Sequence, residues 1–197
     1  MGRVLTNISK RDAILAAAVV ELSGRGFHGA RVERIAASAG ANKQLIFHYF
    51  RSKGGLYAAA VSHILSTSPK PASSEAFTPP DALRRHVGEL AAWLSVSAGS
   101  ATALAECLAR TDLPAEAVAS ARAWRDGVAA ATRTLLEEGQ RQGHFRDDLD
   151  HGAVVELVIG AAIGMALAFP ARPGEALPAP QSPSALGQVI ADYCGWR

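Results

Sequence analysis

Apolar residues recur every three or four positions along most of this 197-residue chain, and no segment alternates apolar and polar residues as a half-buried strand does. Ala, Leu, Glu and Arg, which favour helices, dominate the same stretches. Because 49% of the residues are hydrophobic, the chain can bury a core. We therefore expect an all-α protein of about nine helices.

Glycines, prolines and capping residues separate the expected helices. Gly24 and Gly26 are expected to end the first helix, and Gly40 the second. Asn42 and Ser52 stand where N-caps begin the third and fourth helices, because their side chains accept hydrogen bonds from free backbone N–H groups. The expected ranges are about 9–23, 32–39, 43–50, 53–65, 81–98, 101–110, 114–142, 150–169 and 184–194.

The positive charge is concentrated in the first third of the chain. Residues 1–65 contain nine Lys and Arg against three Asp and Glu, whereas the remainder is net negative. A basic segment of this kind favours a polyanionic partner, although charge alone does not choose among DNA, RNA and an anionic membrane. A proline-rich stretch at 66–80 follows it, so we expect one domain over 1–65 and a second over 66–197.

The two short helices joined by residues 39–42 have the dimensions of a helix-turn-helix. In that motif the first residues of the second helix enter the major groove of DNA. Lys43 can donate to guanine O6 and N7, and Gln44 can bond adenine through N6 and N7. Phe47, one turn further on, can contact a thymine methyl group. The plainer alternative is that Lys43 and Gln44 form a solvated first turn.

Three further side chains in this region can bind phosphate groups, which position a protein on DNA without reading its sequence. His48 and Tyr49 can donate to phosphates, although burial of Tyr49 is the open alternative. Lys53 lies in the first turn of the next helix, where free N–H groups and the helix dipole also favour an anion. The apolar Leu45 and Ile46 are expected in the core instead.

Five segments resemble a known family: RDAILAAA (11–18), GF (26–27), VERIA (32–36), AG (39–40) and NKQLIFHYFRSKGGLY (42–57). They resemble the N-terminal DNA-binding domain of the TetR family of transcriptional regulators. The resemblance implies a homodimer with a three-helix DNA-binding domain and a C-terminal domain that binds a small-molecule inducer. It also implies a repressor that the inducer releases from double-stranded DNA. The residues that it assigns to DNA are Arg31, Lys43, Gln44, Phe47, His48, Tyr49 and Lys53.

The chain departs from the family pattern in two places. Ala30 and Arg31 stand where the family usually has Thr or Ser, so the cap of the second helix is expected to be lost or displaced. Arg31 offers a longer, charged contact to phosphate in its place. Phe47 stands where Tyr is common, so the hydroxyl contact must come from His48 or Tyr49.

The segment 153–169 is apolar nearly all round, which predicts burial on most of its sides. Small residues there permit close approach of another helix, and the resemblance implies that 150–169 and 184–194 pair across a two-fold axis. Such pairing would match a palindromic operator. A membrane span is the rival, but the run is short and contains Glu156, so we expect no membrane partner. The expected interface residues are Val154, Leu157, Gly160, Ala161, Gly164, Val189 and Tyr193.

The expected helices 81–98, 101–110 and 114–142 must enclose any ligand cavity. Few charges lie on their apolar faces, which favours a mostly hydrophobic or aromatic ligand, with Glu106 or Arg125 as a possible polar anchor. Plain core packing is an equal alternative for each lining candidate. The candidates are Trp93, Cys107, Leu108, Trp124, Val128, Met165 and Phe169.

Other classes of protein have little support in this sequence. It contains no phosphate-binding glycine loop, nucleophile elbow or metal motif, so we expect neither an enzyme nor a bound cofactor. Residues 144–151 have metal-binding side chain types, but we expect them to form a helix-capping turn without metal. The two cysteines and the absence of a secretory signal favour the cytoplasm. The alternative function is a basic adaptor that binds an anionic membrane or a protein.

Overall fold

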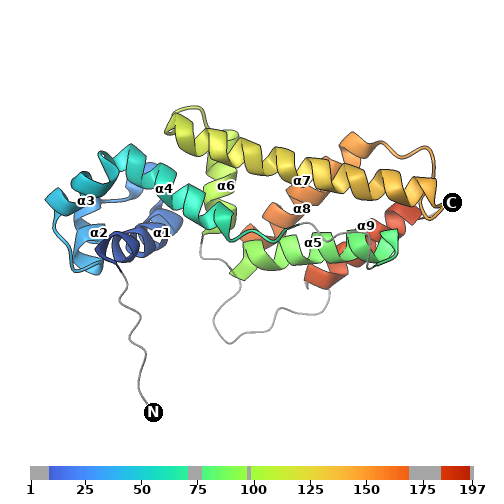
Figure 1. The fold of residues 1–197 in the computed structure, drawn as a ribbon, viewed down its shortest axis with the longest axis horizontal. Coiled ribbons are helices and arrows are strands. Elements are labelled where there is room, and N and C mark those ends of the chain that lie inside the picture. The colour runs from blue at the N-terminus through green and yellow to red at the C-terminus, as the bar shows by residue number, and fades with distance from the viewer. Residues whose placement is uncertain (1–8, 71–76, 97–98, 169–182, 196–197) are drawn as a thin grey trace, which may run out of the picture.

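The computed structural model describes residues 9–70, 77–96, 99–168 and 183–195, and these contain nine helices and no strand. Figure 1 shows α1 to α3 at one end of an elongated molecule, α5, α8 and α9 toward the other, α4 and α6 between them, and α7 running from the middle to the far end. The all-α prediction is confirmed. The helices are α1 (Lys10–Gly29), α2 (Val32–Ser38), α3 (Lys43–Phe50), α4 (Lys53–Ser66), α5 (Pro79–Val96), α6 (Ser100–Ala109), α7 (Ala115–Arg141), α8 (His151–Ala168) and α9 (Pro183–Gly195).

Side-chain caps fix where three of the first four helices begin. The Ser9 hydroxyl accepts a hydrogen bond from the Asp12 backbone N–H at the start of α1. Asn42 Oδ1 accepts from the backbone N–H of Leu45 at 2.8 Å, and Ser52 Oγ accepts from that of Gly55 at 2.9 Å. The predicted caps of α3 and α4 are therefore confirmed, because each satisfies an N–H group that lacks a partner within its helix.

The end of α1 differs from the prediction. The helix continues past Gly24 to Gly29, with a break in its regular path at Gly26, where φ is +63°. A Cβ atom at Gly26 would lie 2.3 Å from Glu106 Oε1, so glycine also permits the close approach of α6. The prediction is confirmed for Gly26, where the regular helix breaks, and is wrong for Gly24, because one glycine costs a helix only about 1 kcal/mol.

The first three helices contribute one end of a continuous hydrophobic core, and α4 extends from that end into the rest of the molecule. Ile14, Ile35 and Ile46, one from each of α1, α2 and α3, are buried. Leu56 and Tyr57 of α4 are buried as well, and α4 packs against α1 and α7. Movement of α4 would therefore change the packing at both ends of the molecule.

Helices α5, α7, α8 and α9 form the second part of the core, in which α5 packs most extensively against α9. A Cβ atom at Gly187 of α9 would lie 2.3 Å from the Arg84 carbonyl oxygen of α5, so the two backbones touch there. At the end of α7, the buried ring of Phe145 covers Gly139. These contacts depend on residues that lie far apart in the sequence or across a turn.

Helix α8 is long and apolar enough to cross a membrane by length and composition. A single such helix is weak evidence, because a core helix of a soluble protein passes the same test. One third of its residues are buried within the chain, including Val158 and Ala162. Leu157, Gly160 and Gly164 are exposed, so the helix has a second face that the described part of this chain leaves open.

We expect Gly139→Ala to lower the free energy of unfolding by about 1 to 3 kcal/mol, because overpacking forces side chains out of place. The new Cβ would lie 2.0 Å from the ring of Phe145. Gly127→Ala is the matched control on the same helix, since a Cβ there meets nothing within 4 Å. Urea unfolding should place Gly127→Ala at or above the wild type. Equal stability of the two variants would contradict the packing argument.

Candidate functional site

The turn between α2 and α3 is held by contacts from its surroundings. Gly40 has φ +57°, which a residue with a side chain rarely adopts. Lys10 Nζ donates to the carbonyl oxygen of Gly40 at 3.1 Å, and the backbone N–H of Ala41 donates to Ala36 O at 2.9 Å. These bonds fix the orientation of α3 relative to α2 before any ligand binds.

Helix α3 buries one face and exposes another. Ile46 and Phe50 are buried, and Leu45 is partly buried, as expected for core residues. Gln44, in the first turn, is exposed, and its side-chain amide has no hydrogen bond with any residue that the structure describes. Its amide is therefore free to donate and accept. The other exposed residues of this helix are Lys43, His48 and Tyr49.

Lys43 already has a partner. Its Nζ atom donates to Glu33 Oε1 of α2 at 2.6 Å and lies 5.8 Å from the ring centre of Phe47, which is partly buried. The bond from Lys43 holds the pKa of the Glu33 carboxyl below its usual value. Any contact of Lys43 with another acceptor must replace this exposed ion pair, which costs little because water already screens it.

Arg31 occupies the N-cap position of α2 and makes no side-chain cap, so the predicted loss of the cap is confirmed. The Glu21 carboxylate of α1 instead bonds the cap residue itself, because its Oε1 atom accepts from the Arg31 backbone N–H at 3.2 Å. The Arg31 side chain is exposed and takes no part in this bond, which uses only the Arg31 backbone. A guanidinium therefore stands next to the helix-turn-helix.

Lys53 is less free than the sequence suggested. Its Nζ atom donates to the His28 carbonyl oxygen at 3.3 Å and lies 5.0 Å from the ring centre of Phe27. Lys53 thus joins the start of α4 to the end of α1. Its role at a phosphate stays a prediction.

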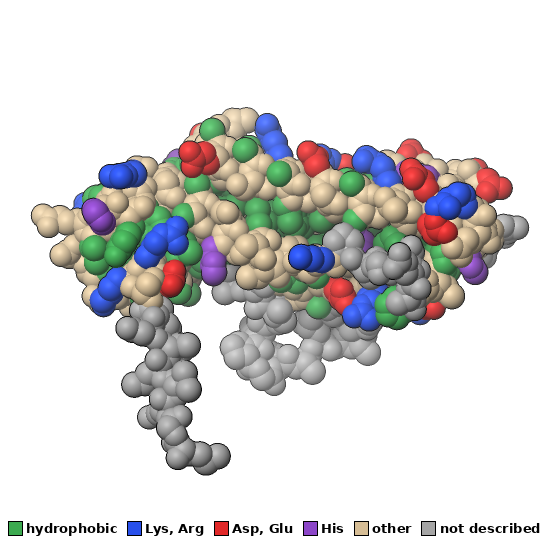
Figure 2. Space-filling view, viewed as in Figure 1, with side chains coloured by type: hydrophobic (Ala, Val, Ile, Leu, Met, Phe, Trp, Pro, Cys, Tyr) green, Lys and Arg blue, Asp and Glu red, His purple; other side chains and the backbone are tan. Residues whose placement is uncertain are grey.

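Three basic residues of this region were missed by the sequence analysis. Arg51 ends α3 with φ +66°, a backbone conformation that residues with side chains rarely adopt, and its N–H donates to Phe47 O at 2.9 Å. Lys10 reaches the turn at Gly40, and the Arg11 guanidinium lies 5.4 Å from the ring centre of Phe50. Figure 2 shows Lys and Arg side chains around apolar side chains on the visible face of this end. The sequence showed the positive charge of Lys10, Arg11 and Arg51, but it did not show that they lie beside α3.

The middle of the molecule contains a buried polar contact between α4 and α6. Tyr57 is buried, and its hydroxyl donates to Glu106 Oε2 at 3.2 Å and lies 3.5 Å from Cys107 Sγ. The Tyr57 ring also packs edge to face on Phe27 at 5.0 Å between centres. Burial raises the pKa of the Cys107 thiol, so this cysteine stays protonated and unreactive near neutral pH.

A cavity of about 280 Å³ lies between α5, α7 and the segment that follows α4. Its walls are mainly apolar, with a few polar groups that can orient a ligand. The lining residues are Ser68, Pro69, Lys70, His86, Leu90, Trp124, Gly127 and Val128. Helix α6 does not line it, which differs from the predicted enclosure.

Two tryptophans connect this cavity to the end of α4. Trp93 Nε1 donates to Thr67 Oγ1 at 3.0 Å, and Trp124 Nε1 donates to Ser68 Oγ at 3.0 Å. The two indoles lie 6.0 Å apart between ring centres. Because Trp124 and Ser68 both line the cavity, a molecule that entered it would contact the residues that hold α4.

The predicted lining residues are only partly brought together. Trp124 and Val128 line the cavity, and Trp93 stacks behind Trp124. Cys107 and Leu108 belong to α6, which contributes no residue to the lining. Met165 of α8 is partly buried, and Phe169 lies outside the described residues.

The two predicted polar anchors are already paired. Glu106 accepts from Tyr57 at the contact between α4 and α6. Arg125 forms an ion pair with Glu156, which joins α7 to α8. Neither side chain lines the cavity of about 280 Å³, so its polar groups come from other residues.

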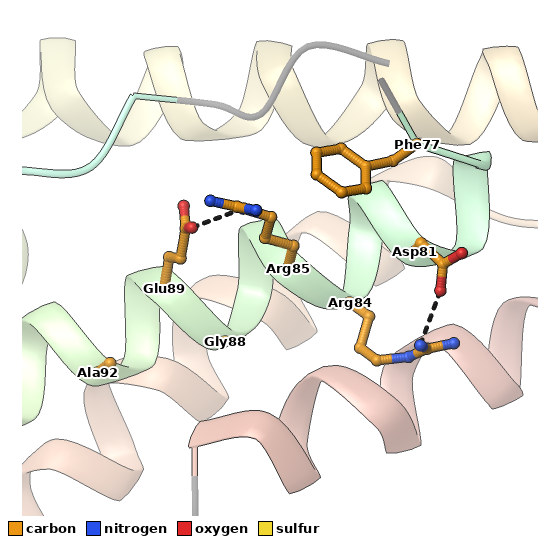
Figure 3. Close-up of a pocket in the computed structure, with 7 residues that line it drawn as sticks. All are labelled: Phe77, Asp81, Arg84, Arg85, Gly88, Glu89 and Ala92. Carbon is orange, nitrogen blue, oxygen red and sulfur yellow. Dashed lines mark hydrogen bonds and ion pairs between the residues drawn. The ribbon is translucent and has the colours of Figure 1, made fainter. Parts of the chain in front are cut away.

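A larger, open groove of about 650 Å³ runs along α5 (Figure 3). Its charged groups are engaged with each other, since Arg84 pairs with Asp81 at 2.8 Å and Arg85 with Glu89 at 2.7 Å. Gly88 and Ala92 contribute little side chain to it. The smaller cavity is the better candidate for a specific ligand, because it is more enclosed and has polar groups without charged partners.

The predicted pairing face consists mostly of exposed residues, with one exception. Leu157 is 46% exposed, Val189 65% and Tyr193 49%. Gly160 and Gly164 are exposed and Ala161 is partly buried. Val154 is buried inside the chain, so its assignment to an interface is wrong: it lies on the inner face of α8.

The segment 144–151 forms a turn and a helix start. Asp150 Oδ1 accepts from the Ala153 N–H at 3.0 Å, as expected for a cap of α8, and His151 Nε2 lies 2.9 Å from Gln140 Oε1. Within the described ranges, no group of three His, Cys, Asp or Glu side chains is placed to hold a metal ion. Asp150 and His151 therefore have structural partners.

The sequence model of bacterial regulatory proteins of the tetR family matches residues 14–60 of this chain. The transcriptional repressor NicS of Pseudomonas putida is 32% identical over 142 residues, which cover 71% of this chain and 67% of NicS. The transcriptional regulator RutR of Escherichia coli is 41% identical over 81 residues, which cover 40% of this chain and 38% of RutR. These relatives are regulators of transcription, which disfavours the adaptor alternative.

Solved structures of regulators share the fold. The hemolysin II transcriptional regulator HlyIIR aligns with a TM-score of 0.70 and 18% identity over 95% of this chain and 98% of its own. FadR from Bacillus subtilis, in complex with stearoyl-CoA, aligns with a TM-score of 0.64 and 16% identity over 93% and 97%. The fold of the described residues is therefore one that known regulators adopt.

We expect His86 to make the folded state less stable in acid. Burial lowers the pKa of His86, against a smaller opposing effect of Glu89, so the unfolded chain binds a proton first as the pH falls. Above the ordinary pKa of about 6.5, His86 is neutral in both states and the free energy of unfolding is highest. Below that pH the unfolded chain gains a proton and the free energy of unfolding falls. Urea unfolding at about pH 7.5 and 5.5 should show a larger loss for the wild type than for His86→Asn. Equal losses would contradict this assignment.

Proposed function

The chain belongs to the TetR family of bacterial regulatory proteins and is a DNA-binding regulator of transcription, and we propose that it is a cytoplasmic repressor that a mostly apolar ligand releases from a palindromic operator. In this proposal residues 1–65 bind DNA, and residues 66–197 bind the ligand and a second copy of the chain. Its main support is the first turn of α3, where a free amide and a basic side chain are exposed above a buried apolar face.

Gln44 and Lys43 read bases in this proposal. Gln44 has both a donor and an acceptor free, which suits the paired N6 and N7 groups of adenine. Lys43 leaves Glu33 and donates to guanine, and Phe47 supports its stem and contacts a thymine methyl group. The ion pair with Glu33 keeps the lysine extended beside α3 before DNA arrives.

The remaining predicted residues bind phosphates. Arg31 offers a guanidinium at the start of α2, and His48 and Tyr49 are exposed on α3. Lys53, with the free N–H groups at the start of α4, supplies a further site for an anion. These contacts contribute salt-dependent affinity that is the same for every DNA sequence.

The open face of α8 and α9 pairs two chains. Leu157, Val189 and Tyr193 would be buried by a second copy, and Gly160 and Gly164 let the two α8 helices approach closely. A two-fold axis at this face sets two α3 helices apart by about 34 Å or a multiple of it, the spacing of successive major grooves. A palindromic operator follows from that symmetry.

Helix α4 carries the signal from ligand to DNA. Ligand in the cavity competes for the contacts of Trp124 and Ser68, and so favours another position of α4. At the other end of α4, Tyr57 is held by Glu106 and Phe27, so α1 moves with it. The ligand acts through a difference in its affinity for the two positions, because a ligand that binds both equally shifts neither.

Selection of genomic DNA fragments by the purified protein at physiological salt, against random competitor DNA, tests the proposed repressor. Recovery of one palindrome supports it, and recovery of unrelated fragments without a shared sequence contradicts it. The genes beside the palindrome then supply candidate ligands. A reporter gene behind that operator distinguishes a repressor from an activator.

We expect Gln44→Ala to weaken binding to the operator by about 1 to 3 kcal/mol and to relax the choice of base at one position of each half-site. Lys53→Ala should instead weaken binding to all sequences and lower the salt slope by about one phosphate contact. Fluorescence anisotropy with operator and random DNA at several salt concentrations measures both effects. Equal losses on both DNAs from both variants would contradict the assigned roles.

We expect Leu157→Glu to convert the dimer to a monomer, because it places two charges in an apolar interface. Val20→Glu, an exposed position on α1, is the control for adding a charge and should leave the dimer intact. Sedimentation velocity separates the two species. A dimer that persists in Leu157→Glu would exclude this face.

A further inference from the structure

One polar side chain in the cavity has a ring nitrogen without a hydrogen bond to any described residue. His86 of α5 is 5% exposed and lines the cavity between Trp124, Leu90 and Val128. Its Nε2 atom lies 3.3 Å from the hydroxyl of Thr132, which is fully buried on α7. The hydrogen bonds of this hydroxyl determine which nitrogen of the His86 ring carries the hydrogen.

The Thr132 hydroxyl has one hydrogen and uses it in a bond to the Val128 carbonyl oxygen at 2.9 Å. It can therefore only accept from His86, so His86 Nε2 carries the hydrogen. In a neutral imidazole the other nitrogen is then an acceptor. Burial favours this neutral form by lowering the pKa of His86.

The acceptor Nδ1 has no hydrogen bond with any residue of the described ranges. The Nδ1 atom is not fully buried, so a hydrogen-bond donor can reach it. Water or a ligand in the cavity can supply the missing donor, because His86 forms part of the cavity wall. A ligand that displaces water from this acceptor therefore binds more tightly if it brings an N–H or O–H group.

We propose that the cavity binds a small, mostly apolar molecule that donates one hydrogen bond, from N–H or O–H, to His86 Nδ1. This inference rests on the proposed function, in which that cavity is the ligand site. It goes beyond that function by naming the residue that selects the ligand and the group that is selected.

The other lining residues restrict the ligand further. Lys70 is exposed, and the described lining contains no Asp or Glu, so a cationic ligand finds no partner there. The ring of Trp124 and the side chains of Leu90 and Val128 supply apolar contact. A volume of about 280 Å³ is at the lower end of the range for ligand sites, which limits the molecule to one or two small rings.

Isothermal titration calorimetry of the full chain with 1-naphthol, naphthalene and 1-methoxynaphthalene tests the inference. These probes share a ring system, and only 1-naphthol donates a hydrogen bond. We expect 1-naphthol to bind about five- to tenfold more tightly than the other two, the usual effect of one neutral hydrogen bond. In His86→Leu the three probes should bind equally.

Thr132→Val is the matched variant, because it keeps the shape of the side chain and removes the hydroxyl that fixes the His86 tautomer. It should reduce the preference for 1-naphthol without changing the binding of naphthalene. Thermal unfolding of each variant checks that it is folded. A preference that survives in His86→Leu would overturn the inference, as would tighter binding of 1-naphthoate than of 1-naphthol.

The experiment separates this inference from the proposed function. Equal binding of the three probes to the wild type would leave the cavity as the ligand site and overturn the role of His86. Lack of binding by every probe would overturn the cavity assignment itself, whereas the genomic selection tests the DNA-binding part independently. Preferred binding of 1-naphthol without release of operator DNA would contradict the coupling through α4 and leave the role of His86 supported.

Discussion

The packing of α4 between the two ends of the molecule is the constraint on which the rest depends. Its buried Tyr57 places a hydroxyl in the core, where it must be hydrogen-bonded, and Glu106 of α6 accepts that bond. Position 26 favours glycine because its φ is +63°, and a Cβ atom there would displace the Glu106 carboxylate from its place beside Tyr57. A polar contact thus ties the position of α4 to the path of α1.

The other end of α4 is tied to the ligand cavity. Two indole N–H groups donate to Thr67 and Ser68, directly after the helix, and Ser68 lines the cavity. In the proposed mechanism, DNA and ligand compete through this single helix without contacting each other. Such coupling needs only two positions of α4 that differ by a few kcal/mol, because a small difference in ligand affinity then shifts their populations.

The two ends of the molecule suit different partners, because one exposes basic residues and the other exposes apolar residues. The basic residues lie around an α3 helix whose exposed first turn suits bases, whereas the exposed apolar residues of α8 and α9 suit a second copy of the chain. Both surfaces are incomplete in the single chain. DNA contact depends on salt, while pairing depends on removing apolar area from water, so the two interactions respond to different conditions.

The sequence by itself determined the helices, the caps at Asn42 and Ser52, and the exposed first turn of α3, because periodicity and capping act over a few residues. It did not determine that α1 continues past Gly24, that Val154 faces inward, or that Lys43 is paired with Glu33. Nor did it reveal His86, whose role depends on Thr132 across the helix pair. Tertiary structure decided these points, because they depend on which distant side chains meet when the helices pack.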